Sequence, residues 1–384
     1  MKKVLLVDTN YSSAPILDYL IAADFDVFVC GANPNDFLAK TAKNYINIDY
    51  SNMDAMRTLI KEMEISYIVP GCNDKSYKVC SELSQDGQFA GLDKPEIVET
   101  INNKEKFRAF AKKVGLPVPG VFTTGDEITT WPVIVKPVDA FSGRGMTVVH
   151  EPNEELLSSA IELAKQYSGT KTCIIEQFMD GQLYSHSAFW ADGAVDMDFI
   201  VEEYGTANPF VVDTSYVVQD FPTEVLCEIR EKVCLMAREL NLVDGLIHTQ
   251  FIMQGSSFYF IEITRRCPGD MYSRLIESST GFQYADAYMR GFLNQKIEPK
   301  KFVYKPAYVL RHTVSQKEES FFKSIGFNFP VLIEQLVFLS LAGDRVKASP
   351  FSRIALLFAR ANSKEDLDFL LKNALSRTMY TISN

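Results

Sequence analysis

The sequence "GLIHTQFIMQGSSFYFIEITRRCPGD", residues 245–270, predicts two strands joined by a tight turn. The polar turn at residues 254–257 separates two apolar runs, which is typical of an antiparallel hairpin. Such a pairing can bring Gln250 and Glu262 to one end of the sheet. Because side chains alternate along a strand, Glu262 and Thr264 should point to the same face.

That face is rich in oxygen, which is the ligand atom that magnesium prefers. Arg265 and Arg266 follow the second strand directly. A carboxylate followed by arginines suits a polyphosphate that a metal ion bridges. Adjacent arginines also occur in solvated loops, and that alternative stays open.

A second motif, "WPVIVKPVDAFSGRGMTVV", covers residues 131–149. Lys136 ends an apolar run, and Gly143 and Gly145 in the turn that follows let successive backbone N–H groups face one point. A compact positive charge beside such a turn favours an anion, and phosphate is the natural guest. The alternatives are that Lys136 extends to solvent and that the turn only satisfies backbone angles.

A third motif, "CIIEQFMDGQ", covers residues 173–182 and reads as a strand that runs into Glu176. An acidic group beside Phe178 and Met179 can accept a hydrogen bond from an exocyclic amine while the backbone contacts a purine edge. The alternative is a solvated glutamate at the end of a strand.

The first 95 residues alternate short apolar runs with helical patterns, which predicts a parallel α/β sheet. Strands are expected at 4–7, 27–30 and 67–70, and helices at 14–23 and 53–63. No G-x-G-x-x-G follows the first strand, and Asp8 would repel a pyrophosphate there, so a dinucleotide site is not expected.

Further along, a helix should open within residues 101–104, with an asparagine as its N-cap, and end at Gly115. Residues 120–180 predict a compact α+β unit with a helix at 154–167. Later elements are expected as strands at 185–190, 251–253 and 258–263 and a helix at 223–240, with mixed strands and a helix in the last 85 or so residues.

Composition narrows the class of protein. The 384 residues carry a formal net charge of −10, and no Lys/Arg block offers the footprint that nucleic acid needs. Seven cysteines without a CxxC pair indicate reduced thiols in a cytoplasmic protein. The apolar run 4–7 stops at Asp8, too early for a signal peptide or a membrane span, so we expect a soluble protein without membrane contact.

The order of these motifs resembles that of ATP-grasp enzymes of the carboxylate–amine ligase type, related to biotin carboxylase, carbamoyl-phosphate synthetase and D-alanine ligase. The similarity runs over roughly residues 1–298. It identifies Lys104 and Lys136 as the two nucleotide lysines and 141–145 as the loop that covers the phosphates. Glu176 would take the adenine amino group, Glu262 would hold magnesium, and Arg266 would steady the γ-phosphate.

The resemblance implies a full set of site residues. Nucleotide-binding residues would be Lys104, Lys136, Ser142, Gly143, Arg144, Gly145, Glu176, Gln177, Phe178, Met179 and Gln182. Metal ligands would be Gln250, Glu262 and Thr264, and catalytic residues would be Arg266, Lys136 and Arg274. Arg274 and His248 are candidates for a substrate carboxylate; a surface arginine and a packed histidine are the alternatives.

Three positions depart from the family pattern. Gln250 stands where a second acidic metal ligand is usual, and Thr264 stands where asparagine is usual. Both keep an oxygen but one negative charge is lost, so magnesium affinity should fall unless other carboxylates compensate. Leu183 stands where a glutamate commonly grips the ribose, so Gln182 or a backbone group would have to replace it.

The implied architecture is α/β and α+β: an N-terminal parallel α/β domain (1–97), a two-lobed ATP-grasp domain (98–298) with a lid (120–180), and a small C-terminal α+β domain (299–384). The implied enzyme uses ATP and Mg²⁺, with Mn²⁺ as a substitute. It activates a small-molecule carboxylate as an acyl phosphate and joins it to an amine, as a homodimer. The rivals are a ligase that uses bicarbonate or a non-amine nucleophile, and a nucleotide-binding protein without turnover.

Overall fold

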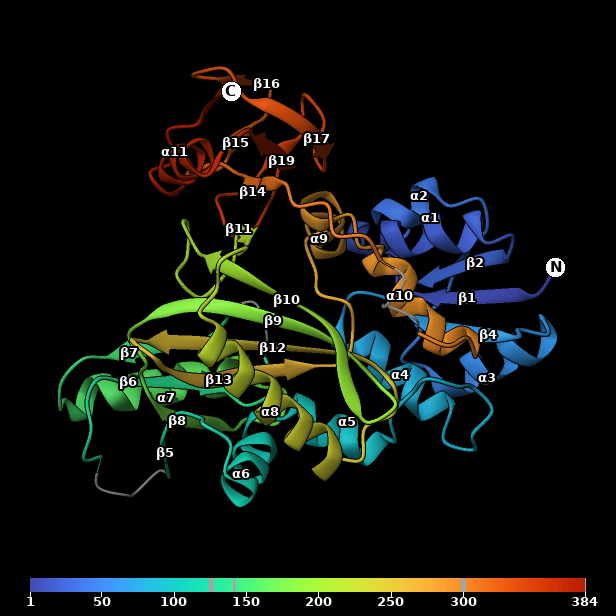
Figure 1. Cartoon of the computed structure of the whole chain (residues 1–384), viewed down its shortest axis with the longest axis horizontal. Coiled ribbons are helices and arrows are strands. Elements are labelled where there is room, and N and C mark those ends of the chain that lie inside the picture. Colours follow the sequence, from blue (N-terminus) through green and yellow to red (C-terminus); the bar gives the residue numbers. More distant parts are fainter. Residues whose placement is uncertain (124–127, 141–142, 298–301, 384) are drawn as a thin grey trace.

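The computed structural model describes residues 1–123, 128–140, 143–297 and 302–383. Within these ranges the chain forms a parallel four-stranded sheet near the N-terminus, a small antiparallel four-stranded sheet, and a large eight-stranded sheet (Figure 1). Two short two-stranded sheets complete the strands described. The predicted combination of α/β and α+β architecture is confirmed.

The N-terminal sheet has the strand order β3-β2-β1-β4, and all its pairs are parallel, as predicted. Asp8, just after the first strand, is buried and accepts hydrogen bonds from Ser13 Oγ (2.7 Å) and Cys72 N–H (3.1 Å). Its carboxylate therefore ties together the loops at the carboxyl ends of two neighbouring strands. The elements are β1 (Lys3–Val7), η1 (Tyr11–Ser13), α1 (Ala14–Ala22), β2 (Asp26–Gly31), α2 (Phe37–Thr41), β3 (Tyr45–Asn47), α3 (Met53–Glu62), β4 (Tyr67–Pro70) and α4 (Asp74–Leu83).

Two helices, α5 (Pro95–Asn102) and α6 (Lys104–Val114), lead to the next part of the chain. The side chain of Asn103 accepts a hydrogen bond from the Lys106 N–H and caps α6. Gly115 adopts φ 73°, a left-handed conformation that ends the helix at low steric cost. Both ends agree with the prediction.

The small sheet has the order β5-β8-β6-β7 and packs against one helix. Val133 and Val135 meet Ala160 and Ala164 of that helix in a core of their own, so the described residues between 120 and 180 form the predicted α+β unit. The elements are β5 (Val121–Phe122), β6 (Val133–Pro137), β7 (Thr147–Val149), α7 (Glu154–Tyr167) and β8 (Cys173–Gln177).

The large antiparallel sheet has the order β13-β12-β9-β10-β11-β14-β19-β17. Its strands and the helix that covers one face are β9 (Gln182–Ala191), β10 (Ala194–Tyr204), β11 (Thr214–Val217), α8 (Thr223–Glu239), β12 (Gly245–Gln254) and β13 (Ser257–Thr264). Ile247 of β12 packs with Ile229 and Val233 of α8 in one core. Because side chains alternate, His248 and Gln250 lie on the opposite face.

The large sheet continues past residue 298, where the sequence predicts the end of a domain. The remaining elements are α9 (Tyr272–Thr280), α10 (Tyr284–Arg290), η2 (Gly291–Leu293), β14 (Tyr308–Val314), β15 (Ser320–Phe321), β16 (Ser324–Phe327), β17 (Leu332–Phe338), β18 (Arg345–Val346), β19 (Ala355–Ala361), α11 (Lys364–Leu375) and β20 (Tyr380–Ser383). Strands β14, β19 and β17 extend the sheet, so hydrogen bonding crosses that predicted limit. The domain limits themselves stay predictions.

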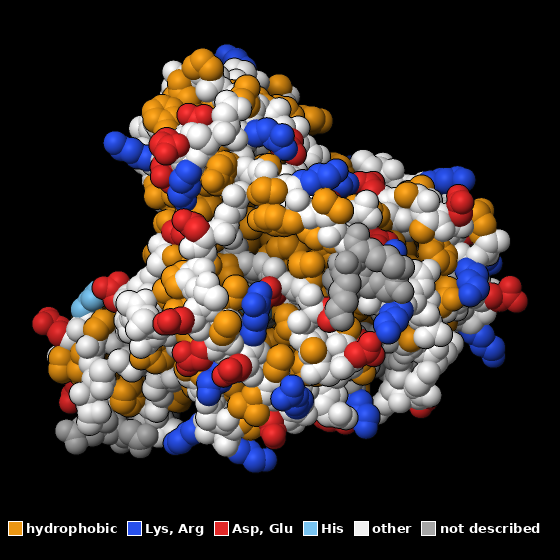
Figure 2. Space-filling model, viewed as in Figure 1, with side chains coloured by type: hydrophobic (Ala, Val, Ile, Leu, Met, Phe, Trp, Pro, Cys, Tyr) orange, Lys and Arg blue, Asp and Glu red, His pale blue; other side chains and the backbone are white. Residues whose placement is uncertain are grey.

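The surface carries charges of both signs. On the face shown in Figure 2, Lys/Arg and Asp/Glu side chains are interspersed, and those drawn in colour form no extended basic region. Across the ranges described, no helix has the length and apolar character needed to cross a membrane.

Candidate active site

The predicted hairpin places its polar residues opposite one another. Gln250 pairs with Glu262 across β12 and β13, and on its other side Gln250 pairs with Ser185 of β9. His248 pairs with Thr264 in the same way. Because cross-strand partners share a face, these side chains line the face of the sheet that α8 does not cover.

Glu262 is the open carboxylate of this face. It is exposed, and within the described part of the chain it has no hydrogen bond or ion pair. Gln250 donates from Nε2 to Glu203 Oε2 at 2.6 Å. The hydroxyl of Thr264 donates to Asp74 Oδ1 at 3.0 Å and accepts weakly from the Arg266 N–H at 3.3 Å, so much of its hydrogen-bonding capacity is already used.

The donor set suits a metal that arrives with phosphates. In the ranges that the structure covers, no cluster of three or more His, Cys, Asp or Glu side chains could hold a metal by itself. Mg²⁺, however, is commonly bound by one or two carboxylates together with substrate phosphates. Glu262 and the carboxamide oxygen of Gln250 fit that arrangement. That Gln250, Glu262 and Thr264 bind a metal ion stays a prediction.

Arg266 is fixed beside the same face by Asp74 at the start of α4. Its Nε lies 2.9 Å from Asp74 Oδ1 and its Nη2 lies 3.3 Å from Oδ2, a two-point contact. Burial opposes the charge, but Asp74 and then Glu262 raise the pKa of Arg266, so the guanidinium stays charged. The contact of Asp74 with Arg266 was not predicted from the sequence.

Lys136 lies near the end of β6 in the small sheet, and its side chain is buried. Its Nζ lies 2.6 Å from Glu176 Oε2, and Arg108 Nε lies 2.6 Å from Glu176 Oε1, with all three side chains buried. Burial alone would raise the pKa of Glu176, but the charges of Lys136 and Arg108 lower it to about 2. Burial lowers the pKa of Lys136, and Glu176 opposes that shift.

Arg108 connects the small sheet to β13, the strand that carries Glu262. Besides its contact with Glu176, it donates from Nη2 to the carbonyl oxygen of Ile261 at 2.8 Å, next to Glu262 on β13. The sequence analysis missed Arg108, although it stands four residues after Lys104 and thus on the same face of α6. Lys104 donates from Nζ to the Ala140 carbonyl oxygen at 2.9 Å, just after β6.

The glycine turn has the backbone that the sequence implied. Gly143 and Gly145 adopt φ 65° and 67°, and an added Cβ would lie 2.9 Å from Phe210 Cβ and 2.8 Å from Tyr167 Cβ, respectively. Both positions therefore require glycine on grounds of conformation and space. Arg144 between them is exposed, whereas the predicted contact Ser142 lies outside the described residues.

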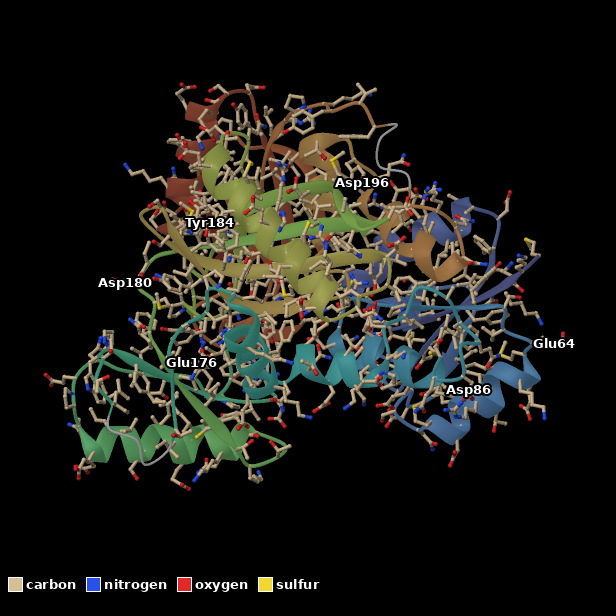
Figure 3. All side chains as sticks on the ribbon, turned by 60° about the horizontal axis from the view of Figure 1, so that its bottom comes forward. Glu64, Asp86, Glu176, Asp180, Tyr184 and Asp196 are labelled. Carbon is tan, nitrogen blue, oxygen red and sulfur yellow. The ribbon has the colours of Figure 1, made fainter. Side chains whose placement is uncertain are left out.

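The adenine hinge, which is the segment 176–182 that includes the predicted adenine contacts, runs from β8 of the small sheet to β9 of the large sheet. Figure 3 labels Glu176, Asp180 and Tyr184 along this path. The N–H groups of Gln177 and Phe178 already donate to the carbonyl oxygens of Gly120 and Pro132, at 2.8 and 2.9 Å. Both oxygens of Glu176 are likewise engaged in the ion pairs described above, so its contact with adenine stays a prediction.

Two further hinge residues have defined surroundings. Met179 is buried, and Gln182 donates from Nε2 to the carbonyl oxygens of Leu183 and Glu203, both at 3.0 Å. The side-chain oxygen of Gln182 is thereby oriented away from these carbonyls. Gln182 thus remains the candidate for the ribose contact that Leu183 cannot make.

Arg274 and His248 have partners of their own. Arg274 pairs with Asp18 (2.7 Å) and Glu277 (3.0 Å) and lines a surface cavity of about 550 Å³. His248 is buried, with Nδ1 2.7 Å from Ser187 Oγ, and burial followed by the charge of Arg266 lowers its pKa well below the usual value. A neutral imidazole attracts a carboxylate weakly. As contacts for a substrate carboxylate, Arg274 and His248 stay predictions.

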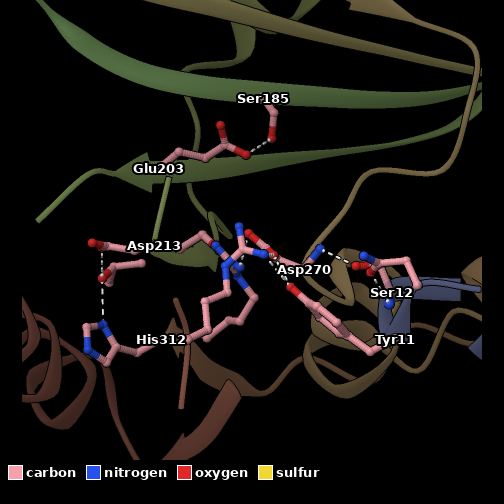
Figure 4. Close-up of polar contacts among 12 residues, drawn as sticks. Tyr11, Ser12, Ser185, Glu203, Asp213, Asp270 and His312 are labelled. Atoms are coloured by element: carbon pink, nitrogen blue, oxygen red, sulfur yellow. Dashed lines mark hydrogen bonds and ion pairs between the residues drawn. The ribbon is translucent and has the colours of Figure 1, made fainter. Parts of the chain in front are cut away.

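A second set of contacts joins all three parts of the chain beside this face (Figure 4). Asp270 accepts a hydrogen bond from Tyr11 Oη at 2.6 Å, and its carboxylate lies 3.4 Å from both Arg311 Nη1 and Arg353 Nη1. Tyr11 begins η1, just after the first strand of the N-terminal sheet, and the arginines come from residues after 300. The cluster fixes the segment that follows Arg266 between the N-terminal and C-terminal parts.

Comparison with known proteins agrees with this geometry. Residues 129–274 match the family model described as the ATP-grasp domain. Residues 129–274 are therefore similar to an ATP-grasp domain, which bears out the resemblance inferred from the sequence.

The curated relatives differ in how much of their own length this chain covers. The carbamoyl phosphate synthase large chain of Gemmatimonas aurantiaca is 25% identical over 183 residues, which are 45% of this chain and 16% of that protein. The formate-dependent phosphoribosylglycinamide formyltransferase of Prochlorococcus marinus subsp. pastoris is 22% identical over 383 residues, covering 97% of this chain and 95% of the relative. The match thus spans only a small part of the synthase but nearly all of the formyltransferase.

Solved structures share the fold over the whole chain. The L-amino acid ligase of Bacillus licheniformis has a TM-score of 0.82 at 17% identity and covers 100% of this chain and 98% of that one. The biotin carboxylase domain dimer of Hydrogenobacter thermophilus 2-oxoglutarate carboxylase, solved with MgADP and bicarbonate, has a TM-score of 0.78 at 16% identity and covers 100% and 90%. At these identities the likeness shows a shared fold.

Proposed function

We propose that this chain is an ATP-dependent ligase that phosphorylates a substrate carboxylate and joins the resulting acyl phosphate to an amine, releasing ADP and phosphate. The observation that carries the proposal is the contact of Arg108 with both Glu176 and the Ile261 carbonyl. This contact links the small sheet that carries Lys136 to the strand that carries Glu262, which supports one shared site for the phosphates and the metal.

The cations have distinct roles in this proposal. Lys104 and Lys136 bind the phosphates of ATP, and Arg266 faces the charge that develops on the transferred phosphoryl group. A carboxylate and the γ-phosphate repel each other, so positive charge held in place before the reaction lowers the barrier. Because Asp74 and Glu176 fix Arg266 and Lys136, little reorganisation accompanies transfer.

Mg²⁺, or Mn²⁺ in its place, would neutralise phosphate charge when bound with ATP. Glu262 and the oxygen of Gln250 would hold it, with Thr264 as a weaker candidate because its hydroxyl donates to Asp74. The turn at 143–145 would cover the phosphates from the side of the small sheet. Exclusion of water there protects an acyl phosphate from hydrolysis.

Full-length similarity supports an ATP-grasp ligase, and the rival that uses bicarbonate, whose carboxylase-domain relative also covers 100% of this chain, is separated by the assay below. A formyltransferase and an L-amino acid ligase both match this chain over nearly its whole length. The acid and the amine are small molecules in this proposal. The domain limits 1–97, 98–298 and 299–384, a homodimer and a cytoplasmic location belong to the same proposal; the carboxylase domain dimer supports the homodimer.

The test is ADP release with Mg²⁺ and panels of acids and amines, with bicarbonate as one acid. ADP that forms only when an acid and an amine are both present supports the ligase. ADP that forms with bicarbonate alone favours a carboxylase-like reaction. Tight ATP binding without ADP on any pair indicates a nucleotide-binding protein without turnover.

A further inference from the structure

Glu203 lies on the same polar face as Gln250 and Ser185 and has no role in the sequence-based site. It is 5% exposed, and it lies on β10, a strand that the sequence analysis did not predict. Its Oε1 accepts from Ser185 Oγ at 2.9 Å, and its Oε2 accepts from Gln250 Nε2 at 2.6 Å. Figure 4 shows the contact with Ser185.

Gln250 lies between two carboxylates. In the sheet order β13-β12-β9-β10, Glu262 is on one side of it and Glu203 is on the other. A carboxamide has one oxygen and one NH₂ group, so the side that receives the NH₂ determines where the oxygen points. The structure turns the NH₂ to Glu203, which leaves the oxygen free for the side of Glu262.

The opposite orientation would harm a metal site. If the NH₂ of Gln250 donated to Glu262, it would occupy the one carboxylate of this face that has no partner in the described chain. It would also present a donor, which repels a cation, where an acceptor is needed. In the structure the NH₂ group donates to Glu203 and not to Glu262.

We infer that Glu203 is a positioning residue for the metal site: it orients the oxygen of Gln250 and supplies, one hydrogen bond further away, the negative charge that glutamine lacks. This inference rests on the proposed function in that it assumes a metal bound with the nucleotide. It accounts for a glutamine where an acid is usual in ATP-grasp enzymes. Residues that orient metal ligands commonly change metal affinity about 10- to 100-fold when they are replaced.

The experiment measures Mn²⁺ binding to the ADP-bound protein by calorimetry or electron paramagnetic resonance, without acid or amine. Glu203→Gln should weaken Mn²⁺ binding about 10- to 100-fold. ADP binding in EDTA should stay within about threefold, because Glu203 acts on the metal and not on the nucleotide. An Mn²⁺ affinity equal to wild type would overturn the inference.

A matched control stands next to Glu203 in the chain. Glu202 is on the same strand but on the opposite face, where it accepts hydrogen bonds from the hydroxyls of Tyr204 and Tyr216. Glu202→Gln removes the same charge and should change Mn²⁺ affinity less than about threefold. An equal loss in both variants would show a general effect of net charge and overturn the specific role of Glu203.

A charge exchange gives the sharpest outcome. Glu203→Gln combined with Gln250→Glu moves the acid to the usual ligand position and leaves an amide beside it. We expect Mn²⁺ affinity to return to within about threefold of wild type. A double variant no better than Glu203→Gln would contradict the inference.

Folding and the proposed function are tested separately. If Glu203→Gln fails to fold, Glu203→Asp is used, because it keeps the charge but withdraws the acceptor from Gln250. The Mn²⁺ affinity should still fall about tenfold. An unchanged Mn²⁺ affinity would contradict the inference. Wild-type protein that binds ADP but no Mn²⁺ would overturn this inference. Normal Mn²⁺ binding without turnover would overturn only the proposed ligase activity.

Discussion

Lys136 and Glu176 form a buried ion pair with 2.6 Å between Nζ and Oε2, and Arg108 holds the second oxygen of the same carboxylate. Two cations thus share one anion, which leaves a net positive charge at the end of the small sheet. Such an excess is costly in an interior unless an anion binds there. The phosphates of ATP are that anion in the proposed function.

Lys136→Ala should abolish measurable ATP use while leaving the fold intact, because Glu176 keeps Arg108 as its partner. Nucleotide titration and thermal unfolding measure the two effects. Lys165→Ala is the control, since Lys165 is a partly exposed lysine of α7 that pairs with Glu162. ATP affinity and rate unchanged in Lys136→Ala would exclude the assigned role.

Glu176→Gln should lower the free energy of unfolding at neutral pH by about 3 kcal/mol, because Glu176 has a pKa of about 2 in the fold against an ordinary value of 4.5. The depressed pKa means that this contribution is present above about pH 4.5 and is lost as the pH falls from 4.5 towards 2. Urea unfolding at neutral pH and across that window checks the sign. Glu162→Gln on exposed α7 is the control; a wild-type advantage that grew as the pH fell would refute the account.

Asp74→Asn should lower kcat more than ATP affinity, because it frees Arg266 to move while leaving Lys104 and Lys136 in place. A loss of about 10-fold or more in kcat is expected for a misplaced catalytic cation. Steady-state kinetics with the acid and amine found by the panel assay measure it. Asp86→Asn, at an exposed position, is the control, and an unchanged kcat would show that Arg266 needs no such support.

Gly145→Ala should weaken ATP binding, because the added Cβ meets Tyr167 and the turn must shift. Gly87→Ala is a matched control: it also has positive φ, 74°, but nothing lies within 4 Å of an added Cβ. Both variants should lose about 1 kcal/mol of stability from backbone strain. Only Gly145→Ala should lose nucleotide affinity, and equal affinities would argue against a phosphate-covering turn.

Much of the fold follows from local signals. The parallel N-terminal sheet, the cap at Asn103, the helix Glu154–Tyr167 and the hairpin of Gln250 and Glu262 all have distinct patterns, and each is present. Strand β10 was missed because its sequence mixes acidic and apolar residues without a clean alternation. Glu203 was therefore missed as well, because its hydrogen-bond partners lie on β9 and β12, which are distant in the sequence.

Contacts between distant segments could not be predicted. Nothing local shows that Arg108 reaches Ile261, 153 residues later, or that Asp74 holds Arg266. The sequence also gave no sign that Arg274 pairs with Asp18 of α1. These contacts depend on how three sheets pack together, and the spacing of residues along the chain does not predict that packing.

The most direct test of the proposed ligase follows an oxygen atom. The acid that supports ADP formation would be labelled with ¹⁸O in its carboxylate, and the released phosphate would be analysed by mass spectrometry after a single turnover with the amine. An acyl phosphate transfers one carboxylate oxygen to phosphate when the amine displaces it, so we predict phosphate carrying one ¹⁸O and none with Lys136→Ala. Amide product accompanied by unlabelled phosphate would contradict the account.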